Sequence, residues 1–194
     1  MTTPTADEFR QEVRTFFDEV LPDVLDGVTG TLPRAKAWRA ALFDHGVAAI
    51  DYPVADGGRG LGSEHLQIYR DESRGRVPRE DATFGIGVGM AMPTIRDHGA
   101  AELRARLLRP GLRGDDIWWP VASVGGSGSG GAALPTGADV DGEGWFVSGE
   151  RGWAAGWTPG AGRPREPCWV TRANTPGRGR WAAHRRRVPK PAAP

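Results

Sequence analysis

Residues 5–21 read TADEFRQEVRTFFDEVL, and this stretch sets the fold class of the first part of the chain. Thr5 and Glu8 have the spacing of a capping box, in which each side chain bonds the backbone amide of the other residue. Apolar side chains then recur every three or four residues, at Phe9, Val13, Phe16, Phe17, Val20 and Val24. That period predicts an amphipathic helix with one buried face. Pro22 interrupts the pattern and predicts a break near Leu21.

Further helices are predicted downstream. The second contains Trp38, Ala41, Leu42 and His45 and stops at Gly46. A glycine-rich loop at 51–60 precedes a third helix, which Ser63 would cap and which would end near Gly75. Residues 83–95 are apolar on all sides and predict a buried helix. Residues 100–108 form the last helix, closed by Pro110.

The pattern changes from residue 117 onward. A turn signal at 141–144 is followed by WFVS at 145–148, which predicts a short strand. After Trp157 the apolar residues follow neither the helical nor the strand period, and Pro, Gly and Arg dominate. We therefore predict a mainly α N-terminal domain at 1–115, the beginning of a small β domain at 116–157, and an irregular or disordered tail at 158–194.

Composition excludes several classes of protein. The single cysteine, Cys168, cannot form an internal disulfide, and no Cys/His cluster has metal-ligand spacing. No stretch approaches the roughly 18 apolar residues of a membrane span, and the N-terminus has no signal-peptide pattern. We expect a soluble, cytoplasmic protein. Residues 158–194 hold nine basic residues and one acid, against 16 basic and 23 acidic residues before them.

The candidate chemical motifs are individually weak. Residues 126–131, GSGSGG, match GxGxxG, but no βαβ unit surrounds them, so a flexible loop is favoured over a dinucleotide site. The basic tail has little aromatic interleaving and no nucleic-acid-binding fold, so nucleic acid is not an expected partner. His45 and His98 each precede a glycine at a helix end, where capping is the expected role. Glu64, Glu72 and Glu102 are expected on exposed helix faces without a catalytic role.

Several segments, in order, resemble the acyl-CoA dehydrogenase family. One set of residues looks like the family's P-x-x-x-G-G-x-G-L and E-x-A-R passage. It consists of Tyr52-Pro53, then Gly57-Gly58-Arg59-Gly60-Leu61, then Glu72 and Arg74. A second set of residues is similar to the segment that leads into the family's β domain. They are Pro93-Thr94-Ile95, His98-Gly99, Glu102, Leu107-Leu108, Pro110, Leu112 and Gly114-Asp115. A third set resembles the strand pair that follows in the family, and it consists of Asp141-Gly142, Gly144-Trp145, Val147-Ser148-Gly149 and Trp153. The resemblance covers about residues 9–157.

The resemblance implies a helical domain, a small β domain and a C-terminal four-helix bundle, with FAD between the last two. It implies α,β-dehydrogenation of acyl-CoA thioesters: a glutamate removes the α-proton, and the flavin accepts the β-hydride. An acyl-CoA thioester, an electron-transfer partner and further copies of the chain are the implied partners. Matches to the family's flavin-contacting positions are Ser123, Ser129 and Trp153, the cofactor-binding residues that the resemblance assigns here. No catalytic residue and no metal ligand is assigned.

The departures from the family pattern lie in the same region. Val124, Gly125 and Gly130 stand where the family has Glu, Pro and Asp, and Ala155 replaces a hydroxyl-bearing residue after Trp153. Residues 158–194 have no counterpart to the remaining β domain or the bundle. The resemblance therefore implies a truncated chain that is inactive alone. A compensated frameshift over 119–131 and an uncompensated one after Trp157 would explain the pattern. The competing interpretation is a non-catalytic helical interaction module.

Overall fold

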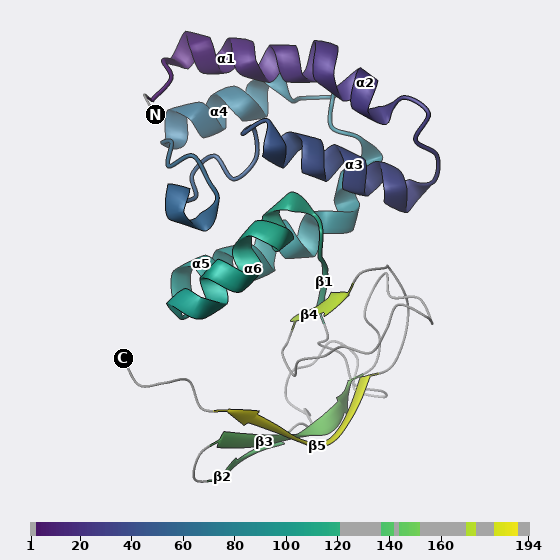
Figure 1. Ribbon diagram of the computed structural model, residues 1–194, viewed down its shortest axis with the longest axis vertical. Coiled ribbons are helices and arrows are strands. Elements are labelled where there is room, and N and C mark those ends of the chain that lie inside the picture. The colour runs from purple at the N-terminus through teal and green to yellow at the C-terminus, as the bar shows by residue number, and fades with distance from the viewer. Residues whose placement is uncertain (1–2, 121–136, 142–143, 152–169, 174–180, 190–194) are drawn as a thin grey trace. The chain divides into compact units, whose positions relative to one another are not determined.

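The computed structural model describes residues 3–120, 137–141, 144–151, 170–173 and 181–189, with side chains described as far as residue 118. The chain divides into two compact units, Met1–Asp115 and Asp116–Pro194. The first unit is helical and the second contains strands (Figure 1). The predicted fold class, a mainly α part followed by the start of a β part, is confirmed.

The first helix continues through Pro22 instead of breaking. It runs as α1 (Ala6–Thr15), a π-helical turn η1 (Phe16–Val20) and α2 (Leu21–Leu25). The Leu21 amide donates to the carbonyl of Phe16, five residues back. Because proline has no N–H and its ring clashes with a carbonyl four residues back, the wider turn lets the helix continue past it. The predicted break near Leu21 is therefore a change of helix type. The capping box of Thr5 and Glu8 is confirmed.

The same arrangement occurs before a second proline. A 3₁₀ segment, η3 (Arg79–Phe84), leads into the π turn η4 (Gly87–Ala91) and α5 (Met92–His98). Here the Met92 amide donates to Gly87, and Pro93 follows. The prediction that residues 83–95 are buried on all sides is wrong, because Met90 is 52% exposed and Gly85 and Gly89 are also exposed. The run is helical with one exposed face.

Two glycines end α3 (Thr31–Asp44) and α6 (Ala101–Arg113). Gly46 has φ +70 after α3, as the sequence predicts. The predicted end of the last helix before Pro110 is wrong, because α6 continues to Arg113 and stops at Gly114, whose φ is +86. Leu108 and Leu112 are fully buried, so packing of this face offsets the hydrogen bond that Pro110 cannot donate.

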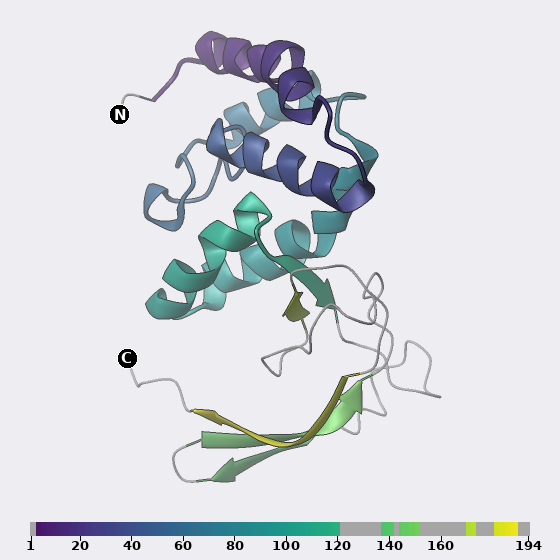
Figure 2. The same cartoon turned by 45° about the vertical axis from the view of Figure 1, so that its right-hand side comes forward.

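A short 3₁₀ turn, η2 (Val54–Asp56), and α4 (Ser63–Glu72) complete the helical unit. The cap of α4 is Gly62 and not Ser63, which is already helical. In Figures 1 and 2, α1 lies along α4, α2 lies against α3, and α5 lies beside α6, which also contacts α3. The fully buried side chains that fill the core between these helices include Trp38, Phe9, Phe16, Phe84, Leu42, Met92, Leu108 and Leu112.

The second unit contains two small antiparallel sheets. In one, β1 (Ile117–Pro120) pairs with β4 (Val170–Ala173). In the other, β3 (Gly144–Arg151) lies between β2 (Gly137–Asp141) and β5 (Trp181–Pro189). Asp141 pairs with Gly144, and β3 contains residues 145–148, so the predicted strand is confirmed. Residues 142–143 of the predicted turn lie outside the described residues. The tail, predicted to be irregular, contains β4 and β5. Their partners are distant in sequence, so no local period could reveal them.

Candidate functional site

The glycine-rich passage after Tyr52 folds into a tight loop. The Gly58 amide donates to the carbonyl of Pro53 at 3.0 Å, and the Gly60 amide donates to that of Tyr52 at 2.8 Å. Gly57 and Gly60 have φ +89 and +63, which disfavour a side chain. At Gly58 a Cβ would lie well inside 3.0 Å of the Tyr52 carbonyl oxygen, where real Cβ atoms are essentially never found. The glycines are therefore required by the loop's own backbone.

Arg59, in the middle of this loop, fastens it to α1. One guanidinium nitrogen lies 2.5 Å from a carboxylate oxygen of Glu12 and 3.4 Å from the carbonyl of Gly46. The same guanidinium covers the ring of Phe9, at 5.3 Å from its centroid. This family-like motif therefore has a structural role, holding the loop and the end of α3 against α1.

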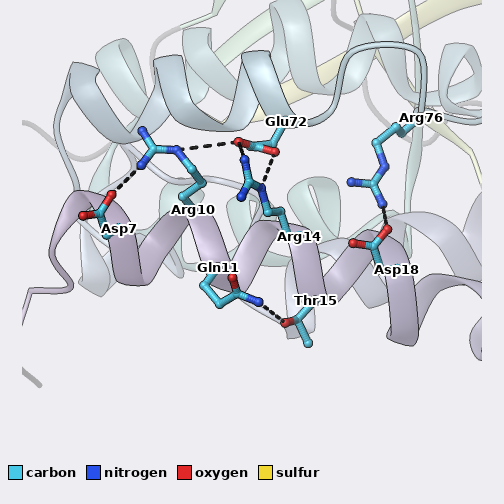
Figure 3. Close-up of polar contacts among 8 residues, drawn as sticks. All are labelled: Asp7, Arg10, Gln11, Arg14, Thr15, Asp18, Glu72 and Arg76. Atoms are coloured by element: carbon cyan, nitrogen blue, oxygen red, sulfur yellow. Dashed lines mark hydrogen bonds and ion pairs between the residues drawn. The ribbon is translucent and has the colours of Figure 1, made fainter.

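Glu72 fastens α4 to α1 in the same way (Figure 3). Arg14 donates two hydrogen bonds of 2.9 Å to its two carboxylate oxygens, and Arg10 lies 3.6 Å away. The bonds from Arg14 hold the pKa of the Glu72 carboxyl below its usual value. Just beyond the end of α4, Arg76 pairs with Asp18 of η1 and covers the ring of Phe17. The expectation of an exposed Glu72 is wrong, since its side chain is only 17% exposed and is paired.

We expect the Glu72→Gln variant to melt roughly 3 to 5 °C below the wild type at about pH 7, because it weakens the bonds from Arg14 and Arg10. The lowered pKa means that the ionised carboxylate stabilises the fold above its unfolded pKa and that this contribution is lost as pH falls through the folded pKa. The two melting temperatures should therefore converge as the pH falls below the folded pKa of Glu72. Glu19 is exposed, and Glu19→Gln is the matched control with little expected effect. A constant difference at all pH values would contradict the ion-pair explanation.

The other candidate acids and bases belong to four different helices or their end caps. Glu64 and Glu102 are exposed, as expected. The Nδ1 atom of His45 lies 3.1 Å from the carbonyl of Ala41, in keeping with a capping role, and His98 is the last residue of α5. Among the described residues no group of His, Cys, Asp and Glu could hold a metal ion.

One surface groove of about 700 Å³ runs along α1. Its lining residues are Thr3, Pro4, Glu8, Gln11, Glu12, Thr15, Phe16, Val20 and His45. Both carboxylates are already engaged, Glu8 with Thr5 and Glu12 with Arg59. We therefore assign no chemistry to this groove.

The predicted flavin-contacting residues Ser123, Ser129 and Trp153 lie outside the described residues, as do 126–131. Along the chain, Ser123 follows the end of β1 by three residues, and Trp153 follows the end of β3 by two. The side chains of this region could supply only some of the hydrogen bonds that a flavin cofactor would need. Two serine hydroxyls can donate to phosphate oxygens, whereas Val124, Gly130 and Ala155 have no polar side-chain atom.

The segment that leads into β1 is likewise structural. Arg39, a residue only 6% exposed, donates from its guanidinium to the carbonyl of Leu112 at 2.8 Å. A Cβ on Gly114 would lie 2.7 Å from Cγ of Arg39. Sequence patterns did not reveal the bonds of Arg39 to Leu112, of Arg59 to Glu12 or of Glu72 to Arg14, because these partners are 73, 47 and 58 residues apart.

The comparisons with known proteins agree with the helical unit. Residues 3–115 match the model of the acyl-CoA dehydrogenase N-terminal domain. The acyl-CoA dehydrogenase IpdE1 of Mycobacterium tuberculosis is 28% identical over 160 residues, which are 77% of this chain and 41% of that protein. FadE34 of the same organism is 32% identical over 124 residues, 64% of this chain and 17% of FadE34. A solved acyl-CoA dehydrogenase from Geobacillus kaustophilus aligns with a TM-score of 0.59 at 17% identity, over 97% of this chain and 57% of that one. The chain thus spans about two fifths of the length of IpdE1.

No helix in the described part of the chain has the length and apolar composition of a membrane span.

Proposed function

The chain belongs to the acyl-CoA dehydrogenase family, and on that premise we propose that it is the N-terminal part of a flavin-dependent enzyme that dehydrogenates acyl-CoA thioesters. The observation that supports this most is the agreement between the matched residues 3–115 and the helical unit Met1–Asp115. Within that unit the family-like residues Arg59 and Glu72 both fasten neighbouring segments to α1. The described part therefore supplies a scaffold, and the chemistry belongs to segments outside it.

FAD is the proposed cofactor, and it would supply the acceptor for the β-hydride. Ser123 and Ser129 would donate hydrogen bonds to its phosphate oxygens, and Trp153 would pack beside its ring system. The proposal extends to an electron-transfer partner, to homo-oligomers and to a cytoplasmic location. The base that removes the α-proton is not assigned to Glu64, Glu72 or Glu102, because Glu64 and Glu102 are exposed and Glu72 is paired with Arg14.

Flavin content of the purified protein tests the proposed cofactor. A yellow protein that releases FAD on denaturation would support the assignment of Ser123, Ser129 and Trp153. A colourless protein that does not take up added FAD would favour the non-catalytic helical interaction module instead.

The frameshift hypothesis makes a separate prediction about the coding nucleotide sequence. Translated in its other two forward frames, the region coding for residues 119–131 should encode S/T-E-P-x-x-G-S-D. The region after Trp157 should encode alternating apolar strands, because a shifted frame would hide them without altering the DNA. Absence of both patterns from both frames would overturn the frameshift explanation. It would leave the family membership untouched, because that rests on residues 3–115.

A further inference from the structure

Two methionines that are two residues apart in sequence lie in opposite environments. Met90 in η4 is 52% exposed, whereas Met92, the first residue of α5, is 0% exposed. Because successive residues of a helix are rotated by about 100°, side chains two positions apart point to nearly opposite sides. Met92 therefore belongs to the core of the helical unit, and Met90 projects from its surface. A reagent in solution reaches the Met90 thioether without any change in the fold.

The surface around Met90 is open because two nearby residues of the same helix are glycines. Gly85 and Gly89 are exposed, and nothing beyond the adjacent residues and backbone turns lies within 4 Å of a Cβ built at either position. The backbone at Met90 is nevertheless held, since its carbonyl accepts a hydrogen bond of 2.8 Å from the Thr94 hydroxyl. The exposure of Met90 is thus a property of the folded helix and does not depend on local unfolding.

We propose that Met90 is an oxidation site, at which a peroxide converts the thioether to a sulfoxide while the helical core stays folded. A lone pair of the sulfur attacks one oxygen of hydrogen peroxide, so that an S–O bond forms and the O–O bond breaks. The sulfur loses two electrons, and the peroxide gains them. The departing hydroxide takes the proton of the transferred oxygen and leaves as water.

The sulfoxide changes the chemical character of this surface. Residues 83–95 contain no charged side chain, and within them Met90 is the large apolar side chain that is exposed. Oxidation makes this side chain polar, so the exposed face of η4 and α5 loses its main apolar group. The same reaction at Met92 would place a polar oxygen in the core without a hydrogen-bond partner, which disfavours it.

Peroxide treatment of the full chain, followed by trypsin digestion and tandem mass spectrometry, tests the site. Cleavage after Arg79 and Arg96 gives a peptide of residues 80–96 that carries both methionines and no Cys, Trp, Tyr or His. Fragment ions on either side of Ala91 therefore assign each added oxygen. We expect Met90 to react at least about tenfold faster than Met92, because Met92 must wait for local opening. Equal rates, or no oxidation of Met90, would overturn the proposal.

A denatured sample and one variant separate structure from sequence. In guanidinium chloride both methionines should react at similar rates, because unfolding exposes both. A preference for Met90 that persists there would contradict the structural explanation. The Met90→Leu variant, treated identically, should leave the 80–96 peptide without added oxygen and carries any oxidation elsewhere in the chain. The oxidised wild type should melt within about 2 °C of this treated variant, as expected for a change at the surface. Loss of cooperative melting in the oxidised wild type alone would show that the core does not stay folded.

Discussion

A protein that consists of these 194 residues is expected to show no turnover of acyl-CoA thioesters above a no-protein control. Removal of the α-proton requires a positioned base, and loss of such a base alone costs about 10² to 10⁴ in rate. None of the three glutamates singled out from the sequence fits this role, because Glu64 and Glu102 are exposed and Glu72 is held by Arg14. The segment that the family resemblance assigns to the flavin has in addition Val124, Gly125 and Gly130 where the family has Glu, Pro and Asp.

The assay uses the purified chain with added FAD, an artificial electron acceptor and thioesters of several chain lengths. As a matched variant, Val124→Glu, Gly125→Pro and Gly130→Asp together restore the loop residues. We expect this triple variant to remain inactive, because restored phosphate contacts do not supply a base. Turnover by either protein well above the control would show that the 194 residues assemble a complete site, and the proposal that the base lies elsewhere would be wrong.

Gly58→Ala is expected to destabilise the helical unit by about 2 to 4 kcal/mol, a large loss for one methyl group. The new Cβ would collide with the backbone carbonyl of Tyr52, which cannot move aside freely because it accepts the Gly60 amide at 2.8 Å. Opening the loop would also displace Arg59 from Glu12 and from the Phe9 ring. One substitution would therefore loosen the contact between the loop and α1.

Gly85→Ala is the matched control, with an effect of opposite sign. Gly85 has right-handed helical geometry, at φ −53 and ψ −42, and nothing lies within 4 Å of a Cβ built there. Alanine should stabilise this helix by about 0.5 to 1 kcal/mol, because glycine loses more backbone entropy on folding. Denaturant unfolding measures both variants. Equal effects of the two substitutions would contradict the steric explanation for Gly58.

Some helix boundaries were predictable from the sequence because they depend on neighbouring residues. The capping box of Thr5 and Glu8 and the stop at Gly46 are local hydrogen-bond and backbone effects, and the structure contains both. The predictions from proline were wrong at Pro110 and incomplete at Pro22. A local rule gives the cost of proline, whereas burial of Leu108 and Leu112 and the π turn before Leu21 decide whether the helix continues.

The candidate site, too, was only partly predictable from the sequence. The order of the family-like motifs was enough to identify the family, and the comparison over residues 3–115 confirms it. The assignment of Ser123, Ser129 and Trp153 to the flavin stays a prediction, since they lie outside the described residues. The pattern gave no warning that Glu72 is paired, because its partner Arg14 is 58 residues away.

By itself, the sequence determined the helical class of the first part, the family and the glycines of the tight loop. These follow from periods and turn chemistry that act over a few residues. Only the tertiary structure decided which charged groups are paired, which helices pass through a proline and where the tail forms strands. Each of these depends on groups brought together from distant parts of the chain, and their energies exist only after the core has formed.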